Sequence, residues 1–263
     1  MQAMDEHAKP CGWTLLSLRP QGQQAALRAA AAAMGGSTLA LPPWRLQRMD
    51  AAMAGVQLQA ALQASRVIFT SPAAVVAAAS LNPVFRQAPM RPWLAVGHGT
   101  LRALRAAGIE HAQAPTRMDS EGLLALPALA GVDGERIGLV TAPGGRGVIA
   151  AALQARGAQM LRADVYRRVP LRVPARTLAR LSHSPMPWLL LVSSGEALQR
   201  VWSQLSPHWQ DLWRARMSVV AASERLQAQA YGLGLTRVLQ ASGPTTAQLL
   251  AACRTVLRDG EGQ

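Results

Sequence analysis

The feature that most constrains the fold is a strand–turn–helix unit that recurs along the chain at a nearly constant spacing. Each unit is a short run of Val, Ile, Leu or Phe, then a turn rich in Gly, Ser, Thr or Pro, then about ten residues of helical pattern. One pair is "RVIFTSPAAVVAAA" (66–79) and "WLLLVSSGEALQRV" (188–201), in which Phe69 and Leu191 lie 122 positions apart. Such alternation predicts an α/β fold, with parallel sheets covered by helices.

Three further pairs occur in the same order. Pro20 and Pro143, each at the end of a predicted strand, lie 123 positions apart, and Gly108 and Gly232, which end two predicted helices, lie 124 apart. A looser pair relates "DSEGLLALPAL" to "PTTAQLLAAC". Because four ordered pairs at one offset are hard to obtain by chance, they indicate an internally duplicated molecule with two similar lobes.

Two proline-containing stretches interrupt this pattern: "LALPPW" (39–44) and "YRRVPLRVP" (166–174). Proline fixes an extended path and resists helix, so both stretches are interpreted as crossings between lobes. A simple split near residue 130 is the alternative that pattern alone leaves open. The expected parts are a discontinuous first lobe (1–38 and 172–263), a second lobe (44–165) and an inter-lobe linker (39–43 and 166–171).

The chain is strongly basic, with a formal net charge of +13 from 27 basic and 14 acidic residues, and Lys9 is its only lysine. The planar guanidinium suits carboxylates, so this balance favours an acidic ligand, although a coding bias toward arginine explains it equally well. Because the arginines are dispersed and few Tyr and Phe could stack on bases, we expect no nucleic-acid partner. The opposing hypothesis predicts nucleic-acid binding that weakens steeply with salt.

Several classes of protein are disfavoured by what the chain lacks. No apolar run reaches the roughly 18 to 20 residues that span a bilayer, and the first ten residues do not follow the order of a signal peptide. We therefore expect no membrane partner and a cytoplasmic location. Cys11 and Cys253 are far apart and the five histidines show no metal-ligand spacing, so neither a disulfide framework nor a metal site is predicted.

Small hydroxyl residues follow the predicted strands of the first pair: Thr70 and Ser71 in one unit, Ser193 and Ser194 in the other. Ligands of parallel α/β sheets gather at the carboxyl ends of the strands, where helix starts also expose unpaired N–H groups and partial positive charge. These positions therefore predict anion binding. "PGGRG" lacks the ending of a P-loop; with Arg146 it could hold a carboxylate, or it could form only a turn.

Two other positions have both a functional and a structural interpretation. Tyr166 begins the second crossing, and because a phenol is protonated at neutral pH it could donate a proton, or it could simply pack at a lobe junction. "DSEG" is interpreted as a helix start capped by Asp119 or Ser120. No G-x-S-x-G elbow or close pair of acids occurs, so a hydrolase triad is not predicted.

Taken together, these motifs resemble those of the uroporphyrinogen-III synthase family. The resemblance runs through "SLRP", "FTSPAAV", "AVGHGTLRALRAAG", "SEGLLAL", "VYRR", "LLLVSSGEAL" and "VVAASERLQAQAYGLG". It implies two flavodoxin-like α/β lobes joined by a two-stranded linker, in a molecule that needs no partner chain and is expected to be a monomer. It also implies a cyclising hydro-lyase of tetrapyrrole and heme biosynthesis. The substrate would be hydroxymethylbilane, a linear tetrapyrrole polycarboxylate, which loses water and inverts ring D to give uroporphyrinogen III, without a cofactor.

The resemblance also assigns residues. It implies that Tyr166 is the catalytic proton donor. The family often has G-x-x-T in its final motif, whereas this chain reads Ala221-Ala222-Ser223-Glu224, and the spacing puts Glu224 opposite Thr100. This departure leaves open a non-enzymatic anion-binding module or an inactive paralogue as the alternative function. The substrate-binding residues implied are Thr70, Ser71, Thr100, Arg146, Ser193, Ser194 and Ser223.

Overall fold

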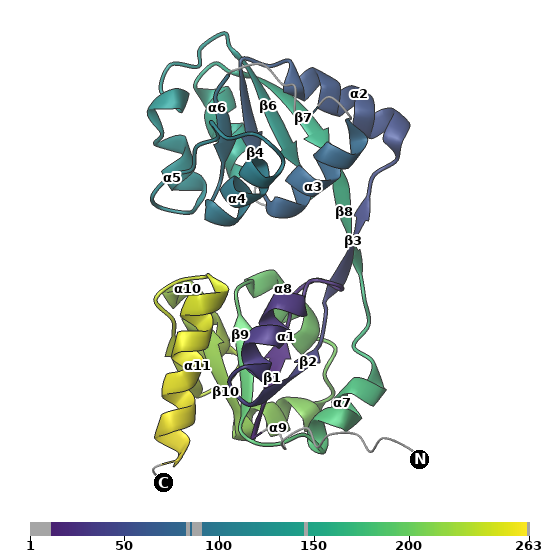
Figure 1. Cartoon of the computed structure of the whole chain (residues 1–263), viewed down its shortest axis with the longest axis vertical. Helices are drawn as coiled ribbons and strands as arrows, with labels where there is room; N and C mark the ends of the chain where they lie inside the picture. The colour runs from purple at the N-terminus through teal and green to yellow at the C-terminus, as the bar shows by residue number, and fades with distance from the viewer. Residues whose placement is uncertain (1–11, 83–84, 86–90, 145–146, 262–263) are drawn as a thin grey trace, which may run out of the picture. The chain divides into compact units, whose positions relative to one another are not determined.

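The computed structural model describes residues 12–82, 85, 91–144 and 147–261. It divides the chain into two compact units (Figure 1). The first unit takes in the chain up to Arg45 and again from Pro170 onward, and the second is Leu46–Val169. The first unit is therefore discontinuous in sequence, because the second is inserted between its first two strands and the rest of its chain.

The first unit is built on a parallel sheet with the strand order β11-β10-β9-β1-β2. The central strands β1, β9 and β10 are buried at every residue, as expected for parallel strands covered on both faces. The strands are β1 (Trp13–Ser17), β2 (Gly36–Ala40), β9 (Trp188–Val192), β10 (Met217–Ala221) and β11 (Arg237–Gln240). The helices are α1 (Ala25–Ala32), α7 (Ala175–Ser182), α8 (Gly195–Trp202), α9 (Pro207–Arg216), α10 (Glu224–Gly232) and α11 (Thr246–Glu261).

The second unit has a parallel sheet of order β5-β4-β6-β7. Alternate residues of β4 enter different core clusters: Val67 and Phe69 join one, and Ile68 joins the other. Since successive strand residues point to opposite faces, the sheet has a core on each face. The strands are β4 (Arg66–Phe69), β5 (Trp93–Ala95), β6 (Arg136–Thr141) and β7 (Gln159–Asp164). The helices are α2 (Ala51–Leu62), α3 (Pro72–Leu81), α4 (His98–Ala106), α5 (Ser120–Leu124) and α6 (Val148–Ala155), with a short 3-10 helix at Pro127–Leu129.

The two sheets repeat one topology. The order β10-β9-β1-β2 of the first unit matches β5-β4-β6-β7 of the second, strand for strand. The predicted α/β fold of two similar parallel-sheet lobes is therefore confirmed. The edge strands β2 and β7 were not foreseen, and Leu39 and Ala40, inside the expected linker range, belong to β2. Both strands are only partly buried, so they lack the continuous apolar run that marked the central strands.

A two-stranded sheet of β3 (Trp44–Arg48) and β8 (Tyr166–Pro170) carries the chain from one unit to the other. Backbone hydrogen bonds join Met49 N to Val165 O at 3.1 Å and Leu171 N to Pro43 O at 3.0 Å. Because the residue numbers of the partners run in opposite directions, the strands are antiparallel. The predicted two-stranded linker is confirmed.

The repeated hydroxyl residues have a structural role at helix starts. Ser71 Oγ accepts the N–H of Ala74 at 3.1 Å, and Ser194 Oγ accepts that of Ala197 at 3.3 Å. These are N-caps of α3 and α8, each worth about 1 kcal/mol. Asp119 caps α5 in the same way, as predicted.

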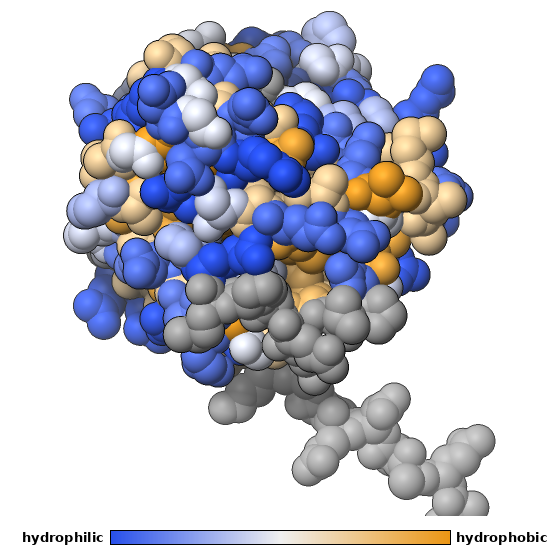
Figure 2. All heavy atoms as spheres, turned by 90° about the horizontal axis from the view of Figure 1, so that it is seen from above, coloured by the Kyte–Doolittle hydropathy of each residue, from blue (hydrophilic) through white to orange (hydrophobic). Residues whose placement is uncertain are grey.

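The face seen in Figure 2 is chemically mixed. In the view of Figure 2, hydrophilic residues are interspersed with smaller, separate apolar areas. Within the described residues, no helix has the length and apolar character that crossing a membrane requires.

Candidate functional site

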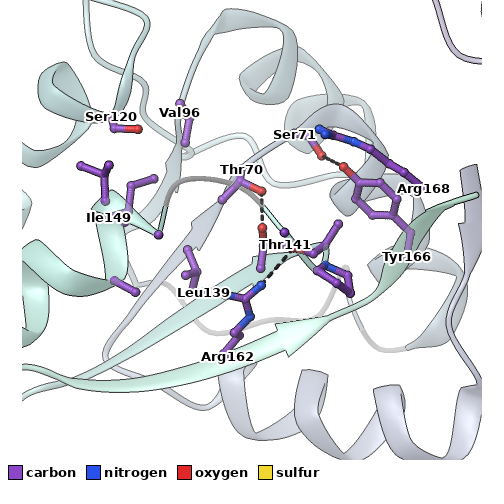
Figure 3. Close-up of a pocket in the computed structure, with 16 residues that line it drawn as sticks. Thr70, Ser71, Val96, Ser120, Leu139, Thr141, Ile149, Arg162, Tyr166 and Arg168 are labelled. Atoms are coloured by element: carbon purple, nitrogen blue, oxygen red, sulfur yellow. Dashed lines mark hydrogen bonds between the residues drawn. The ribbon is translucent and has the colours of Figure 1, made fainter. Parts of the chain in front are cut away.

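A pocket of about 220 Å³ lies in the second unit, beside the carboxyl ends of β4 and β6 (Figure 3). This is the edge at which ligands of parallel α/β sheets bind. Apolar side chains such as Val96, Leu139 and Ile149 line part of it, and the loop after β6 lines another part. The polar side chains that line it are Thr70, Ser71, Ser120, Thr141, Arg162, Tyr166 and Arg168.

Two threonines form a hydroxyl pair in the pocket. The register that pairs Phe69 of β4 with Val140 of β6 brings the next residues, Thr70 and Thr141, side by side. Their Oγ1 atoms lie 2.8 Å apart and share one hydrogen bond. Each hydroxyl therefore keeps hydrogen-bonding capacity for a ligand.

Tyr166 lines the pocket, although most of its side chain is buried. The side chain is only 5% exposed and belongs to the apolar core cluster that contains Phe69 and Val140. Its Oη lies 3.0 Å from Ser71 Oγ. Since Ser71 Oγ accepts the Ala74 N–H, its own proton can be donated to Tyr166 Oη, which leaves the phenolic proton for a ligand. The predicted proton donor thus lies beside a predicted substrate-binding residue.

Arg162 and Arg168 make the pocket basic, and Arg162 is fixed by an internal partner. Its Nε lies 3.1 Å from Asp164 Oδ1 and its Nη2 lies 3.0 Å from the same atom. The same Nη2 donates to the Ala142 carbonyl at 3.0 Å (Figure 3). Arg162 therefore holds the loop after β6 in place, and Asp164 offsets its charge. Arg168 lies near Ser71 and Tyr166 in the same view.

The other predicted site residues lie elsewhere. Thr100 is 4% exposed within α4 and does not line this pocket, so its substrate contact stays a prediction. Arg146 lies outside the described residues. Ser193, Ser194 and Ser223 belong to the first unit, where they follow β9 and β10. Ser193 is exposed, and Ser223 begins α10 without a side-chain cap hydrogen bond.

The positions of the helix starts show which residue of the first unit corresponds to Thr100 of the second. Gly97 and Ser223 are the N-cap residues of α4 and α10. Three residues further on lie Thr100 and Leu226, both buried at 4% and 3% exposure. The structure therefore places Leu226 opposite Thr100, not Glu224 as the spacing predicted, because the two helix starts lie 126 positions apart rather than 124.

Sequence reasoning missed Thr141 and Arg162. Thr141 ends a predicted strand with a hydroxyl, which is the same signal that identified Thr70, and could have been found from it. Arg162 had no such signal, since it lies on the unforeseen edge strand β7. As for a metal centre, the described residues contain no group of three or more His, Cys, Asp or Glu side chains placed to hold an ion.

The fold and the site together define a class: a two-unit parallel α/β protein with a small basic pocket that can bind carboxylates and offer a phenolic proton. Comparison with known proteins gives the family. The sequence model of the family described as uroporphyrinogen-III synthase HemD matches residues 25–251. The chain belongs to this family.

Two relatives agree with this assignment, and a solved structure shares the fold. Uroporphyrinogen-III synthase of Salmonella typhimurium is 33% identical over 183 residues, which are 68% of this chain and 74% of that protein. The Escherichia coli protein of the same name is 30% identical over 197 residues, which are 73% of this chain and 80% of that protein. A crystal structure of a mutant uroporphyrinogen III synthase from Thermus thermophilus covers 94% of this chain and 99% of its own, with a TM-score of 0.62 at 16% identity. That likeness supports the fold alone.

Proposed function

We propose that this protein is an active uroporphyrinogen-III synthase. It cyclises hydroxymethylbilane with loss of water and inversion of ring D, and gives uroporphyrinogen III. The observation that carries the proposal, beside family membership, is the Tyr166 hydroxyl at the pocket, 3.0 Å from Ser71 Oγ. A phenol in this place is a neutral acid that can protonate a departing hydroxyl group.

In the first chemical step the bond between the terminal methylene carbon and its hydroxyl breaks. The pyrrole nitrogen supplies the electron pair and keeps its proton, and Tyr166 gives its own proton to the leaving oxygen, so water departs and an azafulvenium cation remains. Ser71 donates a hydrogen bond to the phenolate that forms and stabilises it. Ring closure through the substituted carbon, fragmentation and reclosure invert ring D. The final rearomatisation releases a proton, which returns to Tyr166 and balances the cycle.

The remaining task of the protein is positioning. Unassisted closure of the azafulvenium cation gives the symmetric isomer, so the enzyme must hold ring D in the other geometry. Correct orientation of reacting groups can contribute about 7 to 11 kcal/mol. The pocket, at about 220 Å³, is smaller than the roughly 300 to 1,000 Å³ sites that enclose a whole small ligand, so it suits one part of this large substrate.

We assign substrate contacts on both units. In the second unit, Thr70 and Ser71 offer hydroxyls, and Arg168 adds positive charge for carboxylate arms. In the first unit, Ser193, Ser194 and Ser223 lie at the carboxyl ends of β9 and β10, and we assign them the same role. The proposed enzyme works as a cytoplasmic monomer.

The deciding experiment is incubation of purified protein with hydroxymethylbilane, followed by chromatographic separation of the oxidised products. We expect isomer III to predominate and to form faster than isomer I forms in buffer alone. Heat-inactivated protein serves as the control for the uncatalysed reaction. Formation of isomer I alone, at the rate of that control, would contradict the proposal.

A further inference from the structure

A basic side chain in the first unit lies outside every site described so far. Arg19 follows β1 by two residues and is half-buried. Its Nη2 donates to Thr246 Oγ1 at 2.8 Å, and Thr246 is the first residue of α11. In the part of the chain that the structure describes, this is the only hydrogen bond of the Arg19 side chain. Most of the guanidinium donors therefore remain available.

The charge of Arg19 has no acidic partner among the described residues, whereas several other arginines there have one. Arg66 pairs with Glu135, and Arg162 with Asp164. Burial lowers the pKa of Arg19, which reflects a cation partly removed from water without a nearby anion to offset it. An anion bound to this guanidinium would offset the solvation that partial burial removes.

The duplicated topology places Arg19 at a ligand-binding position. Pro20 and Pro143 correspond between the units, so Arg19 takes the place of Ala142. Thr246 begins α11 as Ser120 begins α5, and α5 is the counterpart of α11. Both Ala142 and Ser120 line the pocket of the second unit. Arg19 and Thr246 are therefore the counterparts of two residues that line that pocket, and they are hydrogen-bonded to each other.

The neighbouring strand adds a hydroxyl to the same edge. The register pairs Ser17 of β1 with Leu191 of β9, so Arg19 and Ser193, two residues further on, emerge at the same level of the sheet. We propose that Arg19, held by Thr246, binds one carboxylate group of the substrate at the carboxyl edge of the first unit's sheet. The identity of the ligand rests on the proposed function. The geometry itself points only to an anion.

The test compares Arg19→Gln, Arg19→Lys and Thr246→Val with Arg28→Gln, a matched control on an exposed position of α1 in the same unit. Four quantities are measured: KM and kcat with hydroxymethylbilane, Kd for the fluorescent octacarboxylate uroporphyrin, and Tm. For Arg19→Gln we expect KM and Kd to rise about ten- to hundredfold, with kcat little changed and Tm not lowered. Arg19→Lys should recover part of the affinity, and Thr246→Val should lose a few-fold.

Each alternative result is decisive. The proposal would be overturned if every Arg19 variant had KM and Kd values within twofold of those of Arg28→Gln. It would also be overturned if the variants had a lowered Tm with unchanged KM and Kd, because Arg19 would then have a structural role. If Arg19→Gln does not fold, Arg19→Lys and Thr246→Val decide by the same criteria. Wild-type protein that binds uroporphyrin through Arg19 yet forms no isomer III would overturn the proposed function and leave this inference standing. Neither binding nor turnover by the wild type would overturn both.

Discussion

The two units share one strand order but differ in what they present at the carboxyl edge of the sheet. The second presents the paired hydroxyls of Thr70 and Thr141 and the buried Tyr166. The charge of its Arg162 is offset by Asp164. The first offers serines and the half-buried Arg19, whose charge no acid in the described residues offsets. The comparison shows that the backbone pattern and the caps at Ser71 and Ser194 are shared, whereas the side chains beyond them differ. We propose that this difference assigns acid catalysis to one unit and anion binding to the other.

The sharpest test of this difference between the units is substitution of Tyr166, the proposed proton donor. We expect Tyr166→Phe to lower turnover by about 100- to 10,000-fold, because it removes the proton donor of the proposed reaction. Tyr231→Phe is the matched control, since Tyr231 is the chain's other tyrosine, lies in the first unit and is 50% exposed. Single-turnover rates and circular dichroism of both variants provide the measurement. Turnover that is equal in the two variants would remove Tyr166 from the mechanism.

The sheets also differ at one matched core position. Leu15 of β1 is fully buried, and its counterpart 123 residues later is Gly138 of β6. A Cβ at Gly138 would collide with the carbonyl oxygen of Ala61 at the end of α2. We expect Gly138→Ala to lower the free energy of unfolding by about 3 kcal/mol or more, and Leu15→Ala by about 2 to 5 kcal/mol.

Urea denaturation followed by circular dichroism measures both changes. Gly131→Ala is the control, because nothing lies within 4 Å of a Cβ there, and its effect should stay within about 0.5 kcal/mol. A Gly138→Ala protein as stable as this control would show that α2 does not pack against β6 as described.

The matched N-caps separate structural from chemical roles of a hydroxyl. Ser71→Ala and Ser194→Ala should each cost about 1 kcal/mol of stability, because each removes one cap. Only Ser71 also contacts Tyr166, so we expect kcat to fall about ten- to hundredfold in Ser71→Ala alone. Ser194→Ala should change KM rather than kcat. Steady-state kinetics resolves the two, and equal kcat values would argue against a role for Ser71 through Tyr166.

The last expected effect appears only at high pH and concerns a part of α11 that extends beyond its short counterpart α5. Burial raises the pKa of the Cys253 thiol to about 12 from an ordinary 9.0. The unfolded chain then loses this proton at lower pH than the native chain does, so the free energy of unfolding falls as pH rises above 9. The loss should reach about 1.4 kcal/mol at pH 10.

Unfolding measured between pH 8 and pH 10 in wild type and Cys253→Ala provides the comparison, because the alanine variant lacks the titrating group. The stability difference between the two proteins should shrink as pH rises. A difference that is constant with pH would contradict the assignment of a buried thiol.

Local sequence patterns anticipated much of this architecture. The apolar runs of β4 and β9, the cap at Asp119 and the prolines around the linker each signal their structure within a few residues. The edge strands β2 and β7 escaped prediction, because half-buried strands carry a weak apolar signal. Tyr166 and Ser71 were both singled out, but nothing in the sequence indicated that their hydroxyls form a hydrogen bond across 95 positions.

The sequence by itself determined the duplicated α/β pattern and where its helices begin, because strand burial, proline and capping act between near neighbours in the chain. Only the tertiary structure decided which groups meet: Thr70 with Thr141, Tyr166 with Ser71, and Arg19 with Thr246 across 227 positions. Sheet register and helix packing set these distances, and they depend on the whole fold rather than on any one segment.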